Sequence, residues 1–282
     1  MTVIMNGNEL SKKIKENLRL RATKLKEQNI EPSLVVVLVG EDPASQVYVR
    51  NKTRAAEQIG INAIDIRLPE TTTEAEILDL IAKYNADETV HGILVQLPLP
   101  KHINEDRITQ AISPLKDVDG FHPVNMGHLF MNEPLALPCT PHGIMEFFKE
   151  YNIDVTGKNA VVIGRSNIVG RPMAALLLNA NATVTVTHSR TQNLKEIARE
   201  ADILVVAIGR GEFVDADYVK EGAVVIDVGM NRNAAGKLVG DVDFASVNGK
   251  AGYLTPVPRG VGPMTIAMLM QQTIEFAERS LN

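Results

Sequence analysis

A tyrosine and a lysine stand four positions apart in the segment YVRNK, at Tyr48 and Lys52. A helical turn takes about 3.6 residues, so this spacing places both side chains on one face of a helix. Such a pair could transfer a proton to or from an alcohol, hold an unusual lysine base, or lie on a solvated helix face. The rest of the sequence has to decide between these roles.

A glycine turn occurs much later, in NAVVIGRSNIVGRPMAALLL, residues 159–178. It follows an apolar run and precedes a helical pattern, as a dinucleotide-binding turn does. Gly164 lets the chain reverse tightly, Gly170 lets helix and strand approach, and free N–H groups at the helix start would face a pyrophosphate. Ser166 replaces the second glycine of the usual fingerprint. A plain turn between strand and helix is the alternative.

The order of the two motifs excludes one role of the tyrosine–lysine pair. Short-chain dehydrogenases carry the glycine loop near the N-terminus and a Tyr-x-x-x-Lys pair well after it. Here Lys52 precedes Gly164, and the two are expected in different domains. The pair is therefore expected in a substrate site that faces a bound cofactor.

Charge near the glycine turn favours NADP over NAD. An NAD site commonly has an acidic residue about 20 residues beyond the glycines. No Asp or Glu occurs between Asp154 and Glu196, whereas five Lys or Arg residues do. We expect Arg165, Ser189 and Arg190 to surround a 2′-phosphate.

Apolar runs of strand length alternate with helical patterns along the whole chain, which predicts an α/β fold with parallel sheets. The first half has a helix ended by Gly60 and another that begins with a capping box at Thr73 and Glu76. The expected strands cover residues 34–40, 61–68, 90–100, 159–164, 182–187, 201–209 and 222–229.

Two α/β domains with a cleft between them are expected. Residues 1–120 and a returning C-terminal helix, 263–282, form the first domain, which binds the substrate. Residues 140–260 form a second, Rossmann-like domain for NADP. Residues 121–139 form the linker, in a stretch rich in Pro and Gly with weak periodicity.

Composition narrows the function classes. The chain has 282 residues, 45% of them hydrophobic, and a formal net charge of −5, so neither nucleic acid nor an anionic membrane is an expected partner. Cys139 is the only cysteine, and the sequence shows no signal peptide or apolar span, which predicts a cytoplasmic protein. The six histidines have no metal-ligand spacing, so no metal is expected.

Seven segments together resemble the bifunctional methylenetetrahydrofolate dehydrogenase/cyclohydrolase family, in its order and over nearly the whole chain. They are YVRNK, VQLPLP, KDVDGFHPVN, PCTPHG, GRSNIVGRPMA, HSRT and TPVPRGVGPMTIAML. The resemblance implies NADP-dependent oxidation of 5,10-methylenetetrahydrofolate to the methenyl form, followed by hydrolysis to 10-formyltetrahydrofolate. It also implies a homodimer.

The resemblance assigns the hydrolytic step to Lys52, with Tyr48 and Gln96 beside it. An ordinary lysine has a pKa near 10.4, so a neutral lysine base near pH 7 requires about 4 kcal/mol from its surroundings. Gln96 could assist only if its amide group donates to the amine. A protonated lysine that orients the substrate is the alternative. Asp119 would accept from the pterin ring N–H and amino group together, although alone it would be interpreted as a turn residue.

Further residues are assigned by the same resemblance. Ser45 either caps its helix or approaches the substrate, and capping is the simpler expectation. Arg259 replaces the first glycine of a family Gly-Gly pair, so its turn is strained if that position needs a positive φ; otherwise its dihedrals are permissive or the loop differs locally. Its positive charge could also attract the folate glutamate tail. Pro256 and Gly260 are expected at the substrate, and Val169 and Met230 at the cofactor.

Two other functions fit parts of this pattern. A monofunctional NADP dehydrogenase would keep the glycine turn and Asp119 but lose Lys52 or Gln96, and this chain has both. A catalytically silent NADP-sensing protein would not need intact motifs on the substrate side and on the cofactor side.

Overall fold

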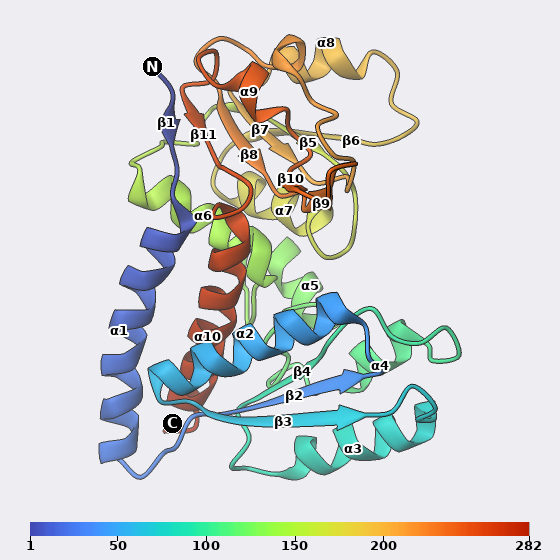
Figure 1. Ribbon diagram of the computed structural model, residues 1–282. Coiled ribbons are helices and arrows are strands. Elements are labelled where there is room, and N and C mark those ends of the chain that lie inside the picture. Colours follow the sequence, from blue (N-terminus) through green and yellow to red (C-terminus); the bar gives the residue numbers. More distant parts are fainter. Residues whose placement is uncertain (282) are drawn as a thin grey trace. The chain divides into compact units, whose positions relative to one another are not determined.

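The computed structural model describes residues 1–281, which form two compact units, each with its own sheet (Figure 1). Unit 1 contains Met1–Ser11 and Thr140–Thr265, and unit 2 contains Lys12–Cys139 and the residues from Ile266 onward. Strands and helices alternate in both units, so the expected α/β class is confirmed.

Unit 2 contains a sheet of three parallel strands in the order β3-β2-β4. All seven residues of the central strand are buried, because helices cover both faces of a parallel sheet. On one face Val35, Val37 and Val39 pack with Ile77 and Ile81 of helix α3 (Glu74–Ala86). Helix α2 (Pro43–Ile59) lies on the opposite face (Figure 1). The strands are β2 (Ser33–Val39), β3 (Asn62–Leu68) and β4 (Gly92–Val95).

The ends of two helices in unit 2 follow the sequence signals. Helix α2 (Pro43–Ile59) ends at Gly60, which has the φ of 93° that favours glycine. Helix α3 (Glu74–Ala86) begins with the expected capping box between Thr73 and Glu76. Both predictions are confirmed.

The stretch expected to be an irregular linker contains helical structure. Helix α5 (Pro123–Phe130) lies within it, and α6 (Cys139–Glu150) begins at its end. Only Asn125 and Leu129 of α5 are buried, so its sequence lacks a repeated apolar stripe. Helix α4 (Glu105–Ala111) was missed for the same reason, because only Ile108 is buried.

Unit 1 contains a parallel sheet of six strands in the order β1-β11-β8-β7-β5-β6. The chain proceeds from β5 to β6 on one side and to β7 on the other, so the direction of winding changes at β5. In such sheets ligands bind outside the carboxyl ends of the strands at this point. The four predicted strands are confirmed as β5 (Asn159–Ile163), β6 (Thr183–Thr187), β7 (Ile203–Val206) and β8 (Val224–Asp227).

Smaller elements complete unit 1. Helix α7 (Gly170–Asn179) follows β5, and α8 (Leu194–Arg199) packs with the core of the sheet. A two-stranded antiparallel hairpin follows β8. The remaining elements are β9 (Asn231–Arg232), β10 (Leu238–Val239), β11 (Tyr253–Leu254), the short helix α9 (Phe244–Val247) and a 3₁₀ turn at Ala216–Tyr218.

The first strand, β1 (Val3–Ile4), pairs with β11 and belongs to unit 1. The sequence pattern places residues 1–120 in the first domain and predicts no strand here, because two exposed residues carry no periodic signal. Helix α1 (Gly7–Glu27) begins in unit 1 and continues in unit 2. Helix α10 (Val261–Arg279) does the same, and its Glu278 pairs with Arg21 of α1 at 2.7 Å.

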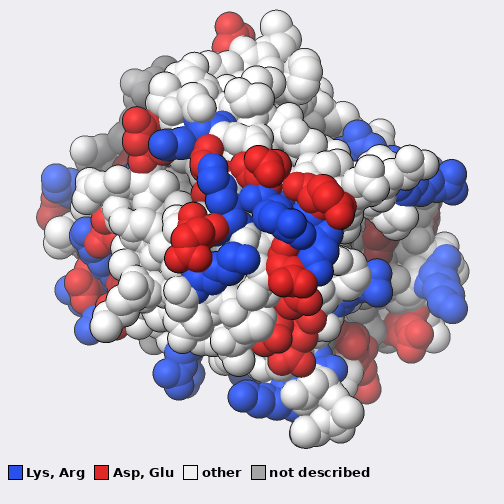
Figure 2. All heavy atoms as spheres, turned by 90° about the horizontal axis from the view of Figure 1, so that it is seen from above, with Lys and Arg blue, Asp and Glu red and all other residues white. Residues whose placement is uncertain are grey.

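Charged side chains of both signs are interleaved near the centre of the face shown in Figure 2. That face therefore has no block of a single sign at its centre. Among residues 1–281, no helix is both long enough and apolar enough to span a bilayer.

Candidate functional site

The lysine of the YVRNK segment lies on the buried side of α2. The buried stripe of this helix includes Ser45, Val49, Lys52, Ala56 and Ile59, and the lysine is only 7% exposed. The solvated-helix alternative is therefore wrong, because the side chain occupies a position at which an apolar residue would be expected.

Gln96 fixes the polar end of this lysine. Lys52 Nζ donates to Gln96 Oε1 at 3.0 Å, and Gln96 Nε2 donates to the carbonyl oxygen of Leu97 at 2.6 Å. A carbonyl oxygen can only accept, so the contact with Leu97 determines which end of the amide faces the lysine. Gln96 therefore offers the lysine an acceptor and no donor, which matches a lysine that donates.

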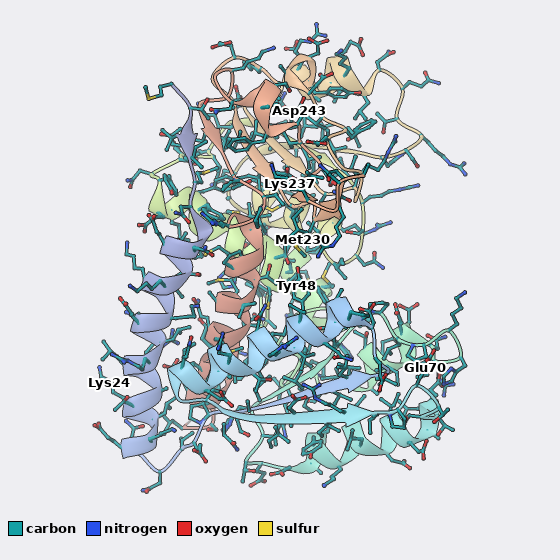
Figure 3. All side chains as sticks on the ribbon, viewed as in Figure 1. Lys24, Tyr48, Glu70, Met230, Lys237 and Asp243 are labelled. Carbon is teal, nitrogen blue, oxygen red and sulfur yellow. The ribbon has the colours of Figure 1, made fainter. Side chains whose placement is uncertain are left out.

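Tyr48 is half-buried one turn before Lys52 on α2 (Figure 3). Burial raises the pKa of its phenol, so the hydroxyl keeps its proton at neutral pH. As a neutral phenol it can both donate and accept a hydrogen bond.

Asp119 lies in a tight loop that Asp117 shapes. The buried carboxylate of Asp117 accepts from Gly120 N at 3.1 Å, His122 N at 2.8 Å and Asn125 Nδ2 at 2.8 Å. The sequence pattern does not single out Asp117, although an Asp shortly before a glycine, as here before Gly120, is typical of a turn.

Burial and charged neighbours shift the pKa of Asp119. Desolvation by burial raises the pKa of Asp119, and Asp117 adds to this effect. The positive charge of Lys52 acts in the opposite direction and lowers this pKa. Tyr48, Lys52, Gln96 and Asp119 all belong to unit 2.

Two further side chains hold this loop and were missed. Gln272 of α10 donates from Nε2 to Val118 O at 2.6 Å and accepts from Leu137 N. Cys139 Sγ also donates to Val118 O, at 3.2 Å, and burial raises the pKa of its thiol well above the ordinary value. Gln272 is 154 residues from Val118 in sequence, so no local pattern could indicate its role.

Ser45 does not cap its helix, which corrects the simpler expectation. Asp42 is the N-cap residue, and its Oδ2 accepts from both the N–H and the hydroxyl of Ser45, each at 2.8 Å. A carboxylate accepts two donors at once, and its charge interacts favourably with the helix start. The hydroxyl of Ser45 is therefore already engaged with Asp42.

Pro256 and Gly260 lie in unit 1, in the turn between β11 and α10. A Cβ at Gly260 would overlap the carbonyl oxygen of Pro256, so the glycine is required by the turn itself. Arg259 has a φ of 82°, and its carbonyl oxygen accepts from Gly7 N at 2.8 Å. The positive φ means that the turn carries the expected strain, and the attraction of the folate glutamate tail stays a prediction.

The glycine turn after β5 has the geometry expected of its two glycines. Gly164 has a φ of 121°, and a Cβ there would overlap the carbonyl oxygen of Ala207. A Cβ at Gly170 would overlap the carbonyl oxygen of Gly164. The tight reversal and the close approach of helix and strand are thus confirmed.

Ser166 accepts hydrogen bonds from the N–H groups at the start of α7, which corrects the expectation that these groups are free. Its hydroxyl accepts from Val169 N at 3.2 Å and Gly170 N at 3.3 Å, and its carbonyl oxygen accepts from Arg171 N at 3.0 Å. The next residue, Pro172, has no N–H. The N–H groups of this first turn are therefore not free for a pyrophosphate.

The outer part of the glycine turn remains open and positive. Arg165, Ser189 and Arg190 are exposed, and within residues 1–281 neither arginine forms an ion pair. Val169 is 9% exposed, so it contributes packing, whereas Met230 is 48% exposed in the loop after β8 (Figure 3). These residues fit a dinucleotide that carries an additional phosphate. Residues 1–281 contain no cluster of three or more His, Cys, Asp or Glu side chains suited to a metal.

Fold and site together define a two-unit α/β protein. One unit is a Rossmann-like nucleotide-binding unit, and the other contains a buried lysine that donates to an amide oxygen and lowers the pKa of a nearby aspartate. Residues 5–119 match the catalytic domain, and residues 138–281 the NAD(P)-binding domain, of tetrahydrofolate dehydrogenase/cyclohydrolase. The chain belongs to this family.

Individual relatives match this chain over 99–100% of its length. The bifunctional protein FolD of Ligilactobacillus salivarius (strain UCC118) is 66% identical, over 100% of this chain and 99% of its own. The crystal structure of the bifunctional enzyme FolD from Campylobacter jejuni is 52% identical, with a TM-score of 0.98 over 99% of this chain and 100% of that chain. The Trypanosoma brucei dehydrogenase-cyclohydrolase, complexed with NADP cofactor and inhibitor, is 38% identical, with a TM-score of 0.95 over 100% of this chain and 99% of that chain.

Proposed function

We propose that this protein oxidises 5,10-methylenetetrahydrofolate to the 5,10-methenyl form with NADP and hydrolyses that product to 10-formyltetrahydrofolate, as part of one-carbon metabolism. Membership of the family and the names of its bifunctional relatives support both activities. The observation that carries the proposal is the buried Lys52, held by Gln96 at 3.0 Å and electrostatically coupled to Asp119.

The oxidation step needs positioning more than proton transfer. A methylene group between two nitrogens releases a hydride with the help of a nitrogen lone pair, and the product is a stabilised cation. NADP, when bound, supplies the hydride acceptor. The chain's contribution is to hold the reactants in register, which can supply a large part of the rate.

Unit 1 supplies the residues for NADP in this proposal. Arg165, Ser189 and Arg190 recognise the 2′-phosphate through charge and hydrogen bonds. The residues that shape and line the cofactor site are Gly164, Ser166, Val169, Gly170 and Met230. The absence of an acidic residue between Asp154 and Glu196 supports NADP rather than NAD.

Unit 2 supplies the residues for hydrolysis. Water attacks the methenyl carbon, and protons must then move to complete the reaction. We assign this work to Lys52, oriented by Gln96, with the Tyr48 hydroxyl beside it. Because Gln96 presents its oxygen, the geometry favours a lysine that donates to and orients the reacting groups over one that begins as a free amine.

Asp119 is assigned to the pterin ring. A carboxylate can accept from the ring N–H and the exocyclic amino group together, and a planar pair of donors suits this acceptor. Desolvation raises the pKa of the free Asp119, and a pterin that donates two hydrogen bonds would favour the ionised form again. Ser45, Pro256 and Gly260 complete the proposed set of substrate residues.

We further propose a cytoplasmic homodimer, as the family resemblance implies. Size-exclusion chromatography with light scattering would measure its mass. A chain that remains monomeric at all accessible concentrations would contradict the dimer.

The test of function is to mix the protein with methylenetetrahydrofolate and NADP and to follow methenyl formation and decay. NADPH and methenyltetrahydrofolate should both be formed, and the methenyl compound should decay faster than in buffer alone. Decay at the buffer rate would leave a monofunctional dehydrogenase. If neither NADPH nor a methenyl signal is formed, the protein is catalytically silent.

A further inference from the structure

A buried carboxylate outside the proposed set of site residues binds the loops at the carboxyl ends of the strands in unit 1. Asp241 is 0% exposed and accepts hydrogen bonds from three successive backbone N–H groups. They belong to Ile208 at 2.7 Å, Gly209 at 3.0 Å and Arg210 at 2.7 Å, and Asn231 Nδ2 donates a fourth bond at 2.9 Å. Four donors saturate the two carboxylate oxygens.

Three of these donors lie in the loop that follows β7, and Asn231 is the first residue of β9, directly after the loop that follows β8. The first loop adjoins the glycine turn, because a Cβ at Gly164 would overlap the carbonyl oxygen of Ala207. The second loop contains Met230, which is assigned to the cofactor above, directly before Asn231. Asp241 thus ties together two loops at the carboxyl edge where such sheets bind dinucleotides.

A second buried carboxylate fixes Asp241 itself. Asp227, at the end of β8, accepts from Gly229 N at 3.0 Å, Asp241 N at 2.8 Å and Val242 N at 3.0 Å. Glycines allow this close packing, because a Cβ at Gly229 would overlap the carboxylate of Asp241, and a Cβ at Gly240 would overlap that of Asp227. Met230 is therefore tied on both sides, through Gly229 to Asp227 and through Asn231 to Asp241.

We propose that Asp241 is a positioning residue for the dinucleotide, which holds the loops after β7 and β8 in the shape that receives the cofactor. Three successive N–H groups that converge on one point form an anion-binding nest. Asp241 fills this nest from within the chain, so a phosphate cannot occupy it. The cofactor phosphates are thereby left to the arginines beside the glycine turn. This inference rests on the proposed NADP-dependent function.

The test compares Asp241→Asn with the wild-type protein. The amide turns an NH₂ group toward backbone donors, so the loops lose part of their anchor. We expect the Kd for NADPH, measured through the fluorescence of NADPH because the chain has no tryptophan, to rise about 10-fold or more. The KM for NADP should rise with it, while hydrolysis of added methenyltetrahydrofolate should change much less.

Asp243→Ala is the matched control. Asp243 lies two residues further on (Figure 3) and caps α9 by accepting from Ser246 N at 3.3 Å. Its loss should lower the Tm but leave the Kd for NADPH within about twofold, because a helix cap acts on local stability. An equal rise in Kd in this control would overturn the inference, since general loosening of unit 1 would then explain both results.

A milder variant keeps the test decisive if Asp241→Asn does not fold. Asn231→Ala removes one of the four donors and should raise the Kd for NADPH severalfold with little change in Tm. Unchanged affinity in Asp241→Asn, or in Asn231→Ala where only that variant folds, would overturn the inference while the function stands. Parallel loss of dehydrogenase and cyclohydrolase would also overturn it. A wild-type protein that fails to bind NADPH would overturn the proposed function first.

Discussion

At the scale of single residues, Lys52 differs most from an average member of its type. A lysine that is 7% exposed and hydrogen-bonded to an amide oxygen has lost most of its hydration. Such a group is retained only where it stabilises the fold or performs chemistry. An apolar side chain can replace the long stem of the lysine without its charge. A substitution can therefore separate a role in stability from a role in chemistry.

Lys52→Met should abolish most of the cyclohydrolase activity while preserving the fold. Methionine matches the stem of lysine and removes the charge, so we expect hydrolysis to fall by about 100-fold or more. Oxidation should fall less, because that step needs no proton relay. Both rates can be measured on one preparation, with Lys24→Met on the exposed part of α1 as the control (Figure 3). Normal hydrolysis by the Lys52 variant would contradict the assigned role.

Arg259 is a residue whose backbone carries strain. A non-glycine residue at a φ of 82° costs about 1–2 kcal/mol of stability. A glycine would remove this strain, but it would also make the unfolded chain more flexible, which offsets part of the stabilisation. We expect Arg259→Gly to raise the Tm by up to a few degrees, measured by calorimetry. Arg259→Ala keeps the positive φ and should give no such rise. If both variants behave alike, strain is not the cause.

At the scale of elements, the glycine turn shows how a strand and a helix fix the identity of one residue. Gly164 and Gly157 both have positive φ, at 121° and 70°, but their surroundings differ. A Cβ at Gly164 would overlap Ala207, whereas a Cβ at Gly157 would meet nothing within 4 Å. The two positions therefore separate the cost of backbone strain from the cost of overlap.

Gly164→Ala should displace the turn and lose NADP binding, because the overlap is with backbone that cannot rotate away. Gly157→Ala should cost about 1 kcal/mol of stability through its φ alone and leave NADP binding intact. NADPH titration and thermal unfolding of both variants provide the comparison. Wild-type affinity in Gly164→Ala would show that the turn tolerates the displacement.

Sequence patterns predicted the elements that bury long apolar runs. The strands from β5 to β8 each carry four or five residues that pair with a neighbour, and all four were predicted. Strands β1 and β11 have two residues each, too few for any periodicity. Helix α5 escaped prediction because it buries only two of its eight residues.

The same limit applies to the residues around the candidate site. Lys52, Gln96 and Asp119 stand in recognisable motifs, so sequence could select them. Asp241 accepts from backbone N–H groups that lie 31–33 residues earlier in the chain. Gln272 bonds to Leu137 and Val118, which are 135 and 154 residues away. Nothing in the local sequence of either residue indicates those partners. Supporting residues of this kind are defined by tertiary contacts alone.

At the scale of the whole molecule, two buried groups of unit 1 make opposite contributions to stability as pH changes. Burial, with Asp241 nearby, raises the pKa of Asp227 from 3.8 to about 7. Burial lowers the pKa of His142 from 6.5 to about 4. Asp227 therefore favours the folded state fully below pH 3.8, and this contribution is lost as the pH rises to about 7. His142 favours it fully above pH 6.5, and its contribution is lost as the pH falls to about 4.

The two effects should largely cancel in the wild-type protein between about pH 4 and pH 6.5. Their upper bounds are about 4 kcal/mol for Asp227 and about 3 kcal/mol for His142, since each pKa step of one corresponds to 1.36 kcal/mol. Removing one group should expose the other. His142→Gln should gain stability, relative to wild type, as the pH is lowered from 6.5 to 4.5, whereas Asp227→Asn should lose it.

Thermal unfolding of the three proteins at half-unit pH intervals measures these differences. Comparison with wild type cancels the titration of the exposed carboxylates that all three share. The sign of each difference is the decisive result, because packing changes shift the Tm equally at every pH whereas a titrating group changes its slope. Parallel curves for all three proteins would mean that neither buried group titrates differently in the folded and unfolded states.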